Sequence, residues 1–175
     1  MTITTSIHHS FHIKLLGAFV LVGLARADMT VATEGESDVV GVALKLADAH
    51  RRDGLRVSVE TDQSGTLALI APETLEAIMT TLIENAVQAG ADTVTIRVEA
   101  MAPVVIDVID NGGGIPPGDR DRVFEPFFTS RRTSGGTGLG LSIARALLAG
   151  AGGTLELGDA ERGTVMRLTL PASQR

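Results

Sequence analysis

The sequence predicts an α/β fold, a two-layer sandwich in which about three helices cover one face of a mixed β-sheet. Segments with helical and with strand periodicity follow one another along the chain, and residues 104–109 are apolar enough to form a central strand. The length of 175 residues suffices for one domain with a hydrophobic core and an extension. We therefore expect an N-terminal segment over residues 1–36 and one domain over residues 37–172.

The N-terminal segment contains one apolar stretch. Residues 15–25 are all apolar or glycine, which is too short for a transmembrane helix. One interpretation is a helix over residues 15–27, buried against a partner helix or a second copy of the chain, which would allow a homodimer. The other is a signal-peptide core that ends at Ala25-Arg26-Ala27. The helix is favoured because Lys14 is the only Lys or Arg that precedes the stretch.

The domain is expected to begin with a helix and a hairpin. Ser37 can cap a helix over about residues 38–52, which carries an apolar stripe. Residues 57–61 alternate like a strand, and residues 62–65 are typical of a turn. We expect residues 66–70 to return as the hairpin partner of that strand.

The next helix has the clearest pattern in the chain. Pro72 suits a first helical turn, and a stripe at helical spacing follows. At about 100° per residue, the stripe leaves Thr81, Asn85 and Gln88 along one flank, whereas Glu84 points nearly opposite the stripe. A ligand at this flank would therefore meet Asn85. The residues of the stripe are Leu75, Ile78, Met79, Leu82, Ile83 and Ala86.

The rest of the domain alternates between strands and a helix. Residues 92–100 and 104–109 are expected to be strands, and residues 139–149 a helix that presents Leu141, Ala144, Arg145 and Leu148 at helical spacing. A final pair of strands is expected over residues 154–157 and 164–170.

Two glycine-rich loops flank an aromatic segment between Asp110 and Leu141. The first loop reads DNGGGIP (110–116), the aromatic segment FEPFFTSR (124–131) and the second loop GGTGLGLS (135–142). Glycine lets a backbone approach a ligand closely, and a glycine loop that opens a helix aims free N–H groups at an anion. The residues alone thus favour a phosphate-bearing ligand held between two mobile loops.

Composition excludes several other classes of function. The net charge is −6, and Trp and Tyr are absent, which argues against a nucleic-acid partner. The absence of cysteine excludes disulfides and thiolate metal sites and fits a reducing compartment. The four histidines show no zinc-site spacing.

In order and spacing, five motifs resemble those of the catalytic ATP-binding domain of sensor histidine kinases. That family lies within the wider group of gyrase-type ATPases, and the resemblance implies its Bergerat fold over about residues 37–172. The helix ending NAVQA is similar to the nitrogen-regulation type. The motifs are LIENAVQAGA (82–91), DNGGGIP (110–116), FEPFF (124–128), GTGLGLSIAR (136–145) and Gly163-Thr164.

The resemblance implies ATP and Mg²⁺ as cofactors. Asp110 would accept a hydrogen bond from the adenine amino group, and Thr164 would support the adenine pocket. Gly112 and Gly114 would let the backbone pass beneath the base. Asn85 would ligate Mg²⁺ through its side-chain oxygen, a hard ligand that suits this cation. The other residues expected to contact the nucleotide are Ile115, Phe128, Gly136, Thr137, Gly138, Leu139, Gly140 and Leu141.

Catalytic roles follow from the same resemblance. Arg131 lies where the family commonly places a basic lid residue, so it is a candidate contact to the γ-phosphate. Thr81 stands where gyrase-type ATPases carry a water-activating glutamate, which favours transfer over hydrolysis. Glu84 is the nearest carboxylate and thus the remaining catalytic candidate, although the helical wheel turns it away. The family's basic residue and tyrosine after the asparagine are here Gln88 and Ala89. The residues expected to anchor the lid are Phe124, Phe127 and Phe128.

The acceptor histidine of such a kinase is not evident in this sequence. His8, His9 and His12 lack the acidic neighbour and downstream proline of the family's acceptor. We therefore expect a cytoplasmic histidine kinase domain that phosphorylates a helical hairpin in cis or in trans and works with a response regulator. As part of a longer kinase it would be tethered to the inner membrane.

Two other functions fit parts of the sequence. One is a non-catalytic nucleotide-binding or docking module, or a phosphotransfer adaptor, that kept the fold. The intact glycine loops argue against it, because a docking module has no need of them. A kinase of a serine on a partner protein would share the fold, but the FEPFF segment and the long second glycine loop fit it poorly.

Overall fold

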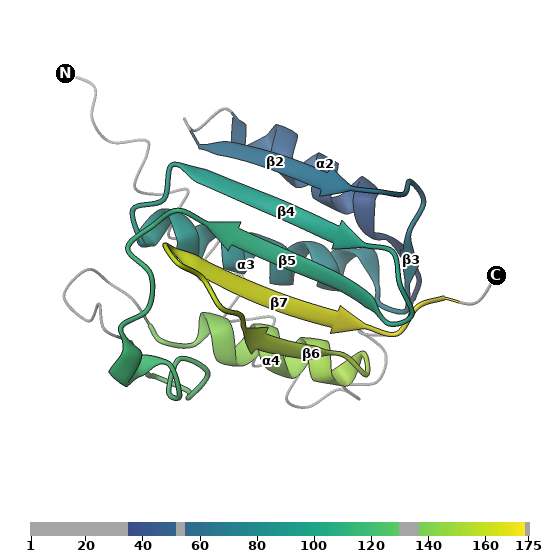
Figure 1. The fold of residues 1–175 in the computed structure, drawn as a ribbon. Coiled ribbons are helices and arrows are strands. Elements are labelled where there is room, and N and C mark those ends of the chain that lie inside the picture. Colours follow the sequence, from purple (N-terminus) through teal and green to yellow (C-terminus); the bar gives the residue numbers. More distant parts are fainter. Residues whose placement is uncertain (1–34, 52–54, 130–136, 174–175) are drawn as a thin grey trace, which may run out of the picture. The chain divides into compact units, whose positions relative to one another are not determined.

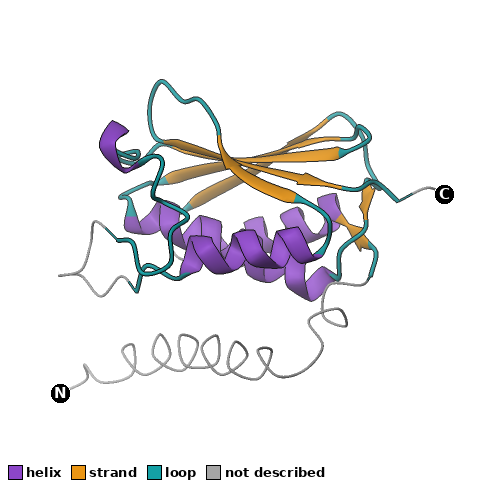
Figure 2. Cartoon of the chain, turned by 90° about the horizontal axis from the view of Figure 1, so that it is seen from below, coloured by secondary structure: helices purple, strands orange, loops and turns teal. Residues whose placement is uncertain are grey.

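The structure is a computed structural model that describes residues 35–51, 55–129 and 137–173. Within these residues, a five-stranded sheet of order β2-β4-β5-β7-β6 packs one face against three helices, and β1 and β3 form a separate pair (Figure 1). Figure 2 shows the sheet and the helices as two layers. The α/β two-layer sandwich is thus confirmed. The strands are β1 (Ser37–Asp38), β2 (Arg56–Thr61), β3 (Leu67–Ala68), β4 (Thr93–Glu99), β5 (Val104–Asp110), β6 (Thr154–Leu157) and β7 (Thr164–Leu170). The helices are α2 (Val39–His50), α3 (Pro72–Gln88), α4 (Gly140–Gly150) and the short 3-10 helix η2 (Pro117–Asp119).

Some sequence predictions lie outside the described residues. They are the apolar helix over residues 15–27 with its signal-peptide alternative, and the site candidates Arg131 and Gly136. Among the helices that are described, none has the length and hydropathy needed to cross a membrane.

The hydrophobic core lies between the sheet and the helices. Helix α3 starts with Pro72 in its first turn and buries the whole predicted stripe, with Leu75, Met79 and Ile83 fully inaccessible. The sheet contributes alternate residues, such as Ile96 on β4 and Ile106 on β5. This match arises because each period in the sequence places its apolar residues on one face of its element.

The residue that caps α2 differs from the prediction. The Asp38 carboxylate accepts a hydrogen bond from the Gly41 N–H at 3.1 Å and forms the cap. Ser37 is fully buried in β1 instead, where its Oγ donates to the Ile70 carbonyl oxygen at 2.6 Å. Either side chain can cap a helix, but the Ser37 hydroxyl is buried and bonded to the Ile70 carbonyl, so the cap is left to Asp38.

The predicted hairpin of residues 57–61 with residues 66–70 is wrong. Strand β2 pairs with β4 in parallel, and β3 pairs with β1 in antiparallel fashion. Alternation in the sequence shows which face of a strand is buried, but it does not identify the neighbouring strand. The turn after β2 leads the chain to the start of α2, where the Thr66 carbonyl accepts from the Val39 N–H.

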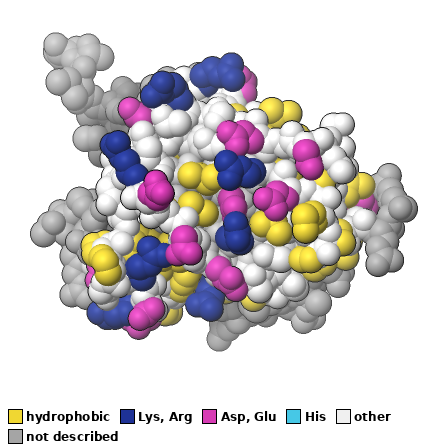
Figure 3. Space-filling view, in the orientation of Figure 1, with side chains coloured by type: hydrophobic (Ala, Val, Ile, Leu, Met, Phe, Trp, Pro, Cys, Tyr) yellow, Lys and Arg dark blue, Asp and Glu magenta, His cyan; other side chains and the backbone are white. Residues whose placement is uncertain are grey.

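The outer face of the sheet carries a row of alternating charges, which we call the charge row. In register across the five strands, it comprises Glu60, Arg97, Asp107, Arg167 and Glu156. Figure 3 looks onto this face and shows acidic and basic side chains along its middle. The Arg97 guanidinium donates to Glu60 at 3.1 Å, and Arg167 donates two hydrogen bonds, of 2.7 and 2.8 Å, to buried Asp107. The Asp107 carboxylate raises the pKa of Arg167.

Candidate functional site

The first glycine loop begins where β5 ends at a buried carboxylate. Asp110 is 9% exposed and pairs across the sheet with Thr164 on β7, which is 7% exposed. One carboxylate oxygen, Oδ1, accepts from the Gly112 N–H at 2.8 Å. The other, Oδ2, makes no hydrogen bond within the part of the chain that the structure describes. The pair therefore presents one free acceptor beside a threonine.

Tight packing requires glycine within this loop. Gly114 has a φ of +72°, and a side-chain carbon there would lie 2.9 Å from the carbonyl oxygen of Gly163. A side-chain carbon on Gly112 would lie 2.9 Å from the carbonyl oxygen of Ala89, which also accepts from the Gly113 N–H at 2.9 Å. The loop thus packs on the end of α3 and on the turn before β7. This packing is a reason for these glycines in addition to the predicted contact with a base.

Asn111, which the sequence analysis did not single out, anchors the same loop. Its Oδ1 accepts from the backbone N–H groups of Asp92 and Thr93, each at 3.1 Å. Its Nδ2 donates to the Asp92 carboxylate at 2.8 Å. This hydrogen bond, with one from the Thr93 hydroxyl, lowers the pKa of Asp92. In the sequence, only its position directly after Asp110 could have indicated a role for Asn111.

Helix α3 brings Thr81 and Asn85 to the start of α4. A side-chain carbon on Gly140 would lie 3.1 Å from the Thr81 methyl and 3.9 Å from the Asn85 amide nitrogen. That amide nitrogen is buried without a hydrogen-bond partner in the described part of the chain. The Thr81 hydroxyl donates to the Ala77 carbonyl at 2.9 Å, and Glu84 is exposed. An unpaired buried amide of this kind is costly unless a ligand completes it.

The aromatic segment contacts the second glycine loop directly. The Phe127 N–H donates to the Gly138 carbonyl at 2.9 Å. A side-chain carbon on Gly138, whose φ is +68°, would lie 2.5 Å from the carbonyl carbon of Phe127 and 2.7 Å from the carbonyl oxygen of Phe128. Phe127 itself has a φ of +65° and is 67% exposed. The two motifs therefore meet through their backbones immediately before α4.

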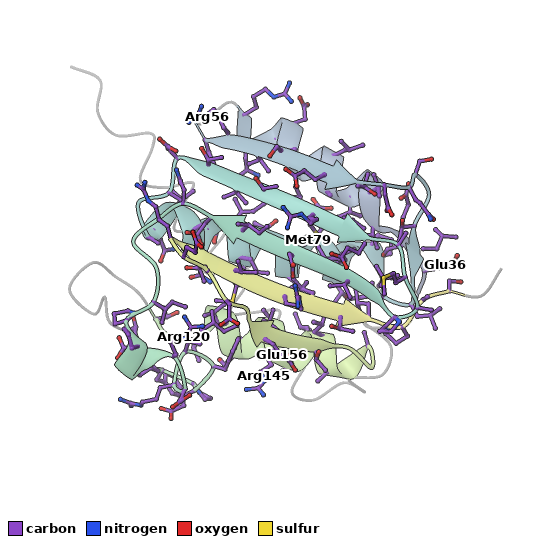
Figure 4. All side chains as sticks on the ribbon, in the orientation of Figure 1. Glu36, Arg56, Met79, Arg120, Arg145 and Glu156 are labelled. Carbon is purple, nitrogen blue, oxygen red and sulfur yellow. The ribbon has the colours of Figure 1, made fainter. Side chains whose placement is uncertain are left out.

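Two arginines stack on the phenylalanines of this segment. The Arg145 guanidinium lies 4.9 Å from the centre of the Phe124 ring, and that of Arg122 lies 4.4 Å from the Phe128 ring. Figure 4 labels Arg145 on α4. Helical spacing predicted Arg145 on the same face as Ala144 and Leu148, but its side chain is exposed, whereas those two residues are buried. An exposed arginine can still contribute a cation–π contact, which spacing alone does not reveal.

The remaining nucleotide candidates lie around these contacts. Ile115 is partly buried against the core, as is Leu141 on α4. Leu139 is partly buried, and Thr137 is exposed and accepts from the Leu139 N–H at 3.4 Å.

A surface hollow of about 750 Å³ borders the first glycine loop. Its other walls are residues 160–163 and Arg120, which donates to the Gly158 carbonyl at 3.2 Å. Neither Asn85 nor Asp110 lines it. The candidate site lies instead where Asn85 and Asp110 adjoin the glycine loops, because the Asn85 amide nitrogen and Asp110 Oδ2 have no hydrogen-bond partner in the described part of the chain.

Comparisons with known proteins identify a matching family and several similar chains. The family model of histidine kinase-, DNA gyrase B- and HSP90-like ATPases matches residues 70–174. The chain is 32% identical over 140 residues to the sensor protein KdpD of Escherichia coli (strain K12), covering 77% of this chain and 15% of KdpD. It is 49% identical over 71 residues to the nitrogen regulation protein NtrY of Azorhizobium caulinodans, covering 39% of this chain and 9% of NtrY. The chain thus spans a minor part of each of these relatives.

A solved structure is similar over most of its length. The ATP-binding domain of PrrB from Mycobacterium tuberculosis superposes with a TM-score of 0.67 at 28% sequence identity. The match covers 79% of this chain and 97% of that structure.

Proposed function

This chain belongs to the family of histidine kinase-, DNA gyrase B- and HSP90-like ATPases, and from that premise we propose that it binds Mg-ATP and donates the γ-phosphoryl to a histidine. Among the relatives named above, KdpD is a sensor protein and the PrrB structure is an ATP-binding domain. We assign this activity to a catalytic domain over residues 37–172. The acceptor would be a helical hairpin in cis or in trans, and the phosphoryl group would pass on to a response regulator.

The buried Asp110 carboxylate is the observation that best supports nucleotide binding. Its Oδ1 is occupied by the Gly112 N–H, so Oδ2 is left as an acceptor. The adenine amino group is a donor, whereas guanine presents a carbonyl oxygen at the same position. A fixed acceptor beside Thr164 therefore favours adenine, because guanine would leave two acceptors facing each other.

The residues of the site fit a magnesium ion that arrives with the nucleotide. No cluster of three or more His, Cys, Asp or Glu able to hold a metal occurs in the described ranges. Mg²⁺ commonly takes few ligands from a protein and the rest from phosphates and water. The Asn85 amide, which lacks a protein partner at its nitrogen, would supply one such ligand after rotation about its last bond. When bound, the ion would neutralise charge on the phosphates.

Thr81 supports transfer rather than hydrolysis. A general base beside the γ-phosphate must accept a proton from water, and a threonine hydroxyl cannot do so near neutral pH. Here the hydroxyl is also committed to the Ala77 carbonyl, with its methyl turned toward Gly140. Glu84 stays a candidate, but it is exposed on α3. Phosphoryl transfer would then await an acceptor side chain.

Calorimetry with Asp110→Asn tests nucleotide binding. We expect the wild type to bind Mg-ATP, and Asp110→Asn to bind it about 10- to 100-fold more weakly, because an amide donor would face the adenine amino group. The variant should also gain affinity for GTP relative to ATP. Asp121→Asn, which removes the same charge from an exposed loop position, is the matched control. No binding by the wild type, or equal affinity in both variants, would favour a docking module without catalysis.

Transfer is tested separately with radiolabelled ATP. The chain is mixed with Mg-ATP labelled at the γ-phosphate and a helical hairpin that bears an acceptor histidine. We expect an acid-labile label on the hairpin. Tight ATP binding without label on any such hairpin would refute the kinase assignment.

A further inference from the structure

Asn111 joins the first glycine loop to the turn between α3 and β4. Its side chain receives two backbone N–H groups and donates to a carboxylate, so three hydrogen bonds fix one amide. Its own N–H donates to the Thr93 carbonyl at 3.3 Å. Asn111 lies between Asp110, which offers the free acceptor, and Gly112, which binds the other oxygen of the same carboxylate.

We propose that Asn111 is a positioning residue that sets the preference of this site for adenine over guanine. The inference rests on the proposed function, since it concerns how Asp110 meets the base. Asn111 does not contact the base itself. It acts by holding the backbone that carries the Gly112 N–H, which orients the Asp110 carboxylate.

The orientation of the Asp110 carboxylate depends on how the loop is attached. The Asp110 backbone is held in the sheet by its ladder partners Val94 and Thr164. Beyond it, Gly112 packs on Ala89, and Gly114 packs on Gly163. Between these attachments, Asn111 ties the loop to the turn before β4 and so sets the position of the Gly112 N–H, which binds the carboxylate. Without that tie, the carboxylate can shift by a few tenths of an ångström. A hydrogen bond to an adenine amino group weakens rapidly with such a shift. The same shift would weaken the repulsion between the Asp110 carboxylate and the carbonyl oxygen of guanine, which excludes that base.

The pair with Asp92 explains why asparagine is needed. An aspartate at position 111 could still accept from the N–H groups of Asp92 and Thr93. It would, however, bring a second carboxylate to the place where Nδ2 now lies 2.8 Å from the Asp92 carboxylate. Like charges at that distance repel, and the loop would move away from the turn. The double variant, with Asn111→Asp and Asp92→Asn, places the carboxylate at position 111 and the amide at position 92. One hydrogen-bond donor again faces one acceptor, and the net charge is unchanged.

The exchange gives a direct test. Affinities for Mg-ATP and Mg-GTP are measured by calorimetry for the wild type, Asn111→Asp, Asp92→Asn and the double variant. We expect Asn111→Asp to lower the ratio of ATP to GTP affinity about tenfold, and the double variant to recover to within about threefold of the wild type. Asp92→Asn keeps an amide opposite Asn111 and should change the ratio little.

The outcomes separate positioning from general stability. Thermal melting of each variant shows whether it is folded, and Asn111→Ser, which adds no charge, replaces Asn111→Asp if that variant does not fold. A lowered melting temperature with an unchanged ratio, or no recovery in the double variant, would overturn the inference alone. Absence of Mg-ATP binding by the wild type would refute the proposed function, and the inference with it.

Discussion

The charge row allows a matched comparison of two arginines. Arg167 and Arg97 are almost equally exposed, at 49% and 47% of their side chains, and each pairs with one carboxylate. The partners differ, because the side chain of Asp107 is 6% exposed and that of Glu60 is 54% exposed. Replacing either arginine by methionine removes one positive charge and keeps most of the aliphatic stem. Any difference between the two variants therefore reports the burial of the partner.

We expect Arg167→Met to cost about 2 kcal/mol of stability. The substitution removes two charge-assisted hydrogen bonds and leaves Asp107 without its partner in a poorly solvated position. The half-exposed guanidinium and the adjacent Arg97 moderate this cost. Arg97→Met leaves Glu60 in water, so it should cost between about 0 and 1 kcal/mol. For a domain of this size, about 2 kcal/mol corresponds to roughly 6 °C in melting temperature.

Urea unfolding at pH 7 and low salt, followed by circular dichroism, measures both variants. Adding Asp107→Leu to Arg167→Met should recover most of the loss, since an apolar pair can replace a buried ion pair. Equal losses in the two arginine variants, or no recovery in the double variant, would refute the argument from burial.

Two further predictions concern the loops. Gly138→Ala should weaken Mg-ATP binding about tenfold or more, because the added carbon would collide with the backbone of Phe127 and force the aromatic segment away. The control is Gly118→Ala, since a side-chain carbon there would have no atom within 4 Å. Equal binding of Mg-ATP by the two variants in calorimetry would contradict the assigned contact. The lowered pKa of Asp92 predicts a stabilising contribution that is present above its ordinary pKa of about 3.9 and is lost as the pH falls through the folded-state value. The stability difference between wild type and Asp92→Asn in urea should therefore shrink on acidification, and a difference that grows instead would show that the sign is wrong.

The sequence predicted those features that depend on one element alone. The stripe of α3 follows from local periodicity, and the apolar composition of residues 104–109 indicates a central strand, so α3 with its buried face and β5 with its central place were predicted correctly. The pairing of β3 with β1 depends on contacts between residues about 30 positions apart, such as Ser37 and Ala68, and no local pattern encodes them.

The candidate site was predictable to a similar degree. Motif order identified Asp110 and Asn85, and the fold places both beside glycine loops. Asn111 and Arg145 could not be assigned from sequence, because their partners, Asp92 and Phe124, lie about 20 residues away and only the folded chain brings them together.

The charge row also bears on the edges of the sheet. It ends on Glu60 at β2 and on Glu156 at β6, so each edge presents a carboxylate at the same level. A strand from another copy that joined β2 to β2 or β6 to β6 at this level would set two carboxylates side by side. Charged side chains on edge strands discourage such pairing. The same alternation that runs across five strands therefore opposes the addition of a sixth from an identical chain.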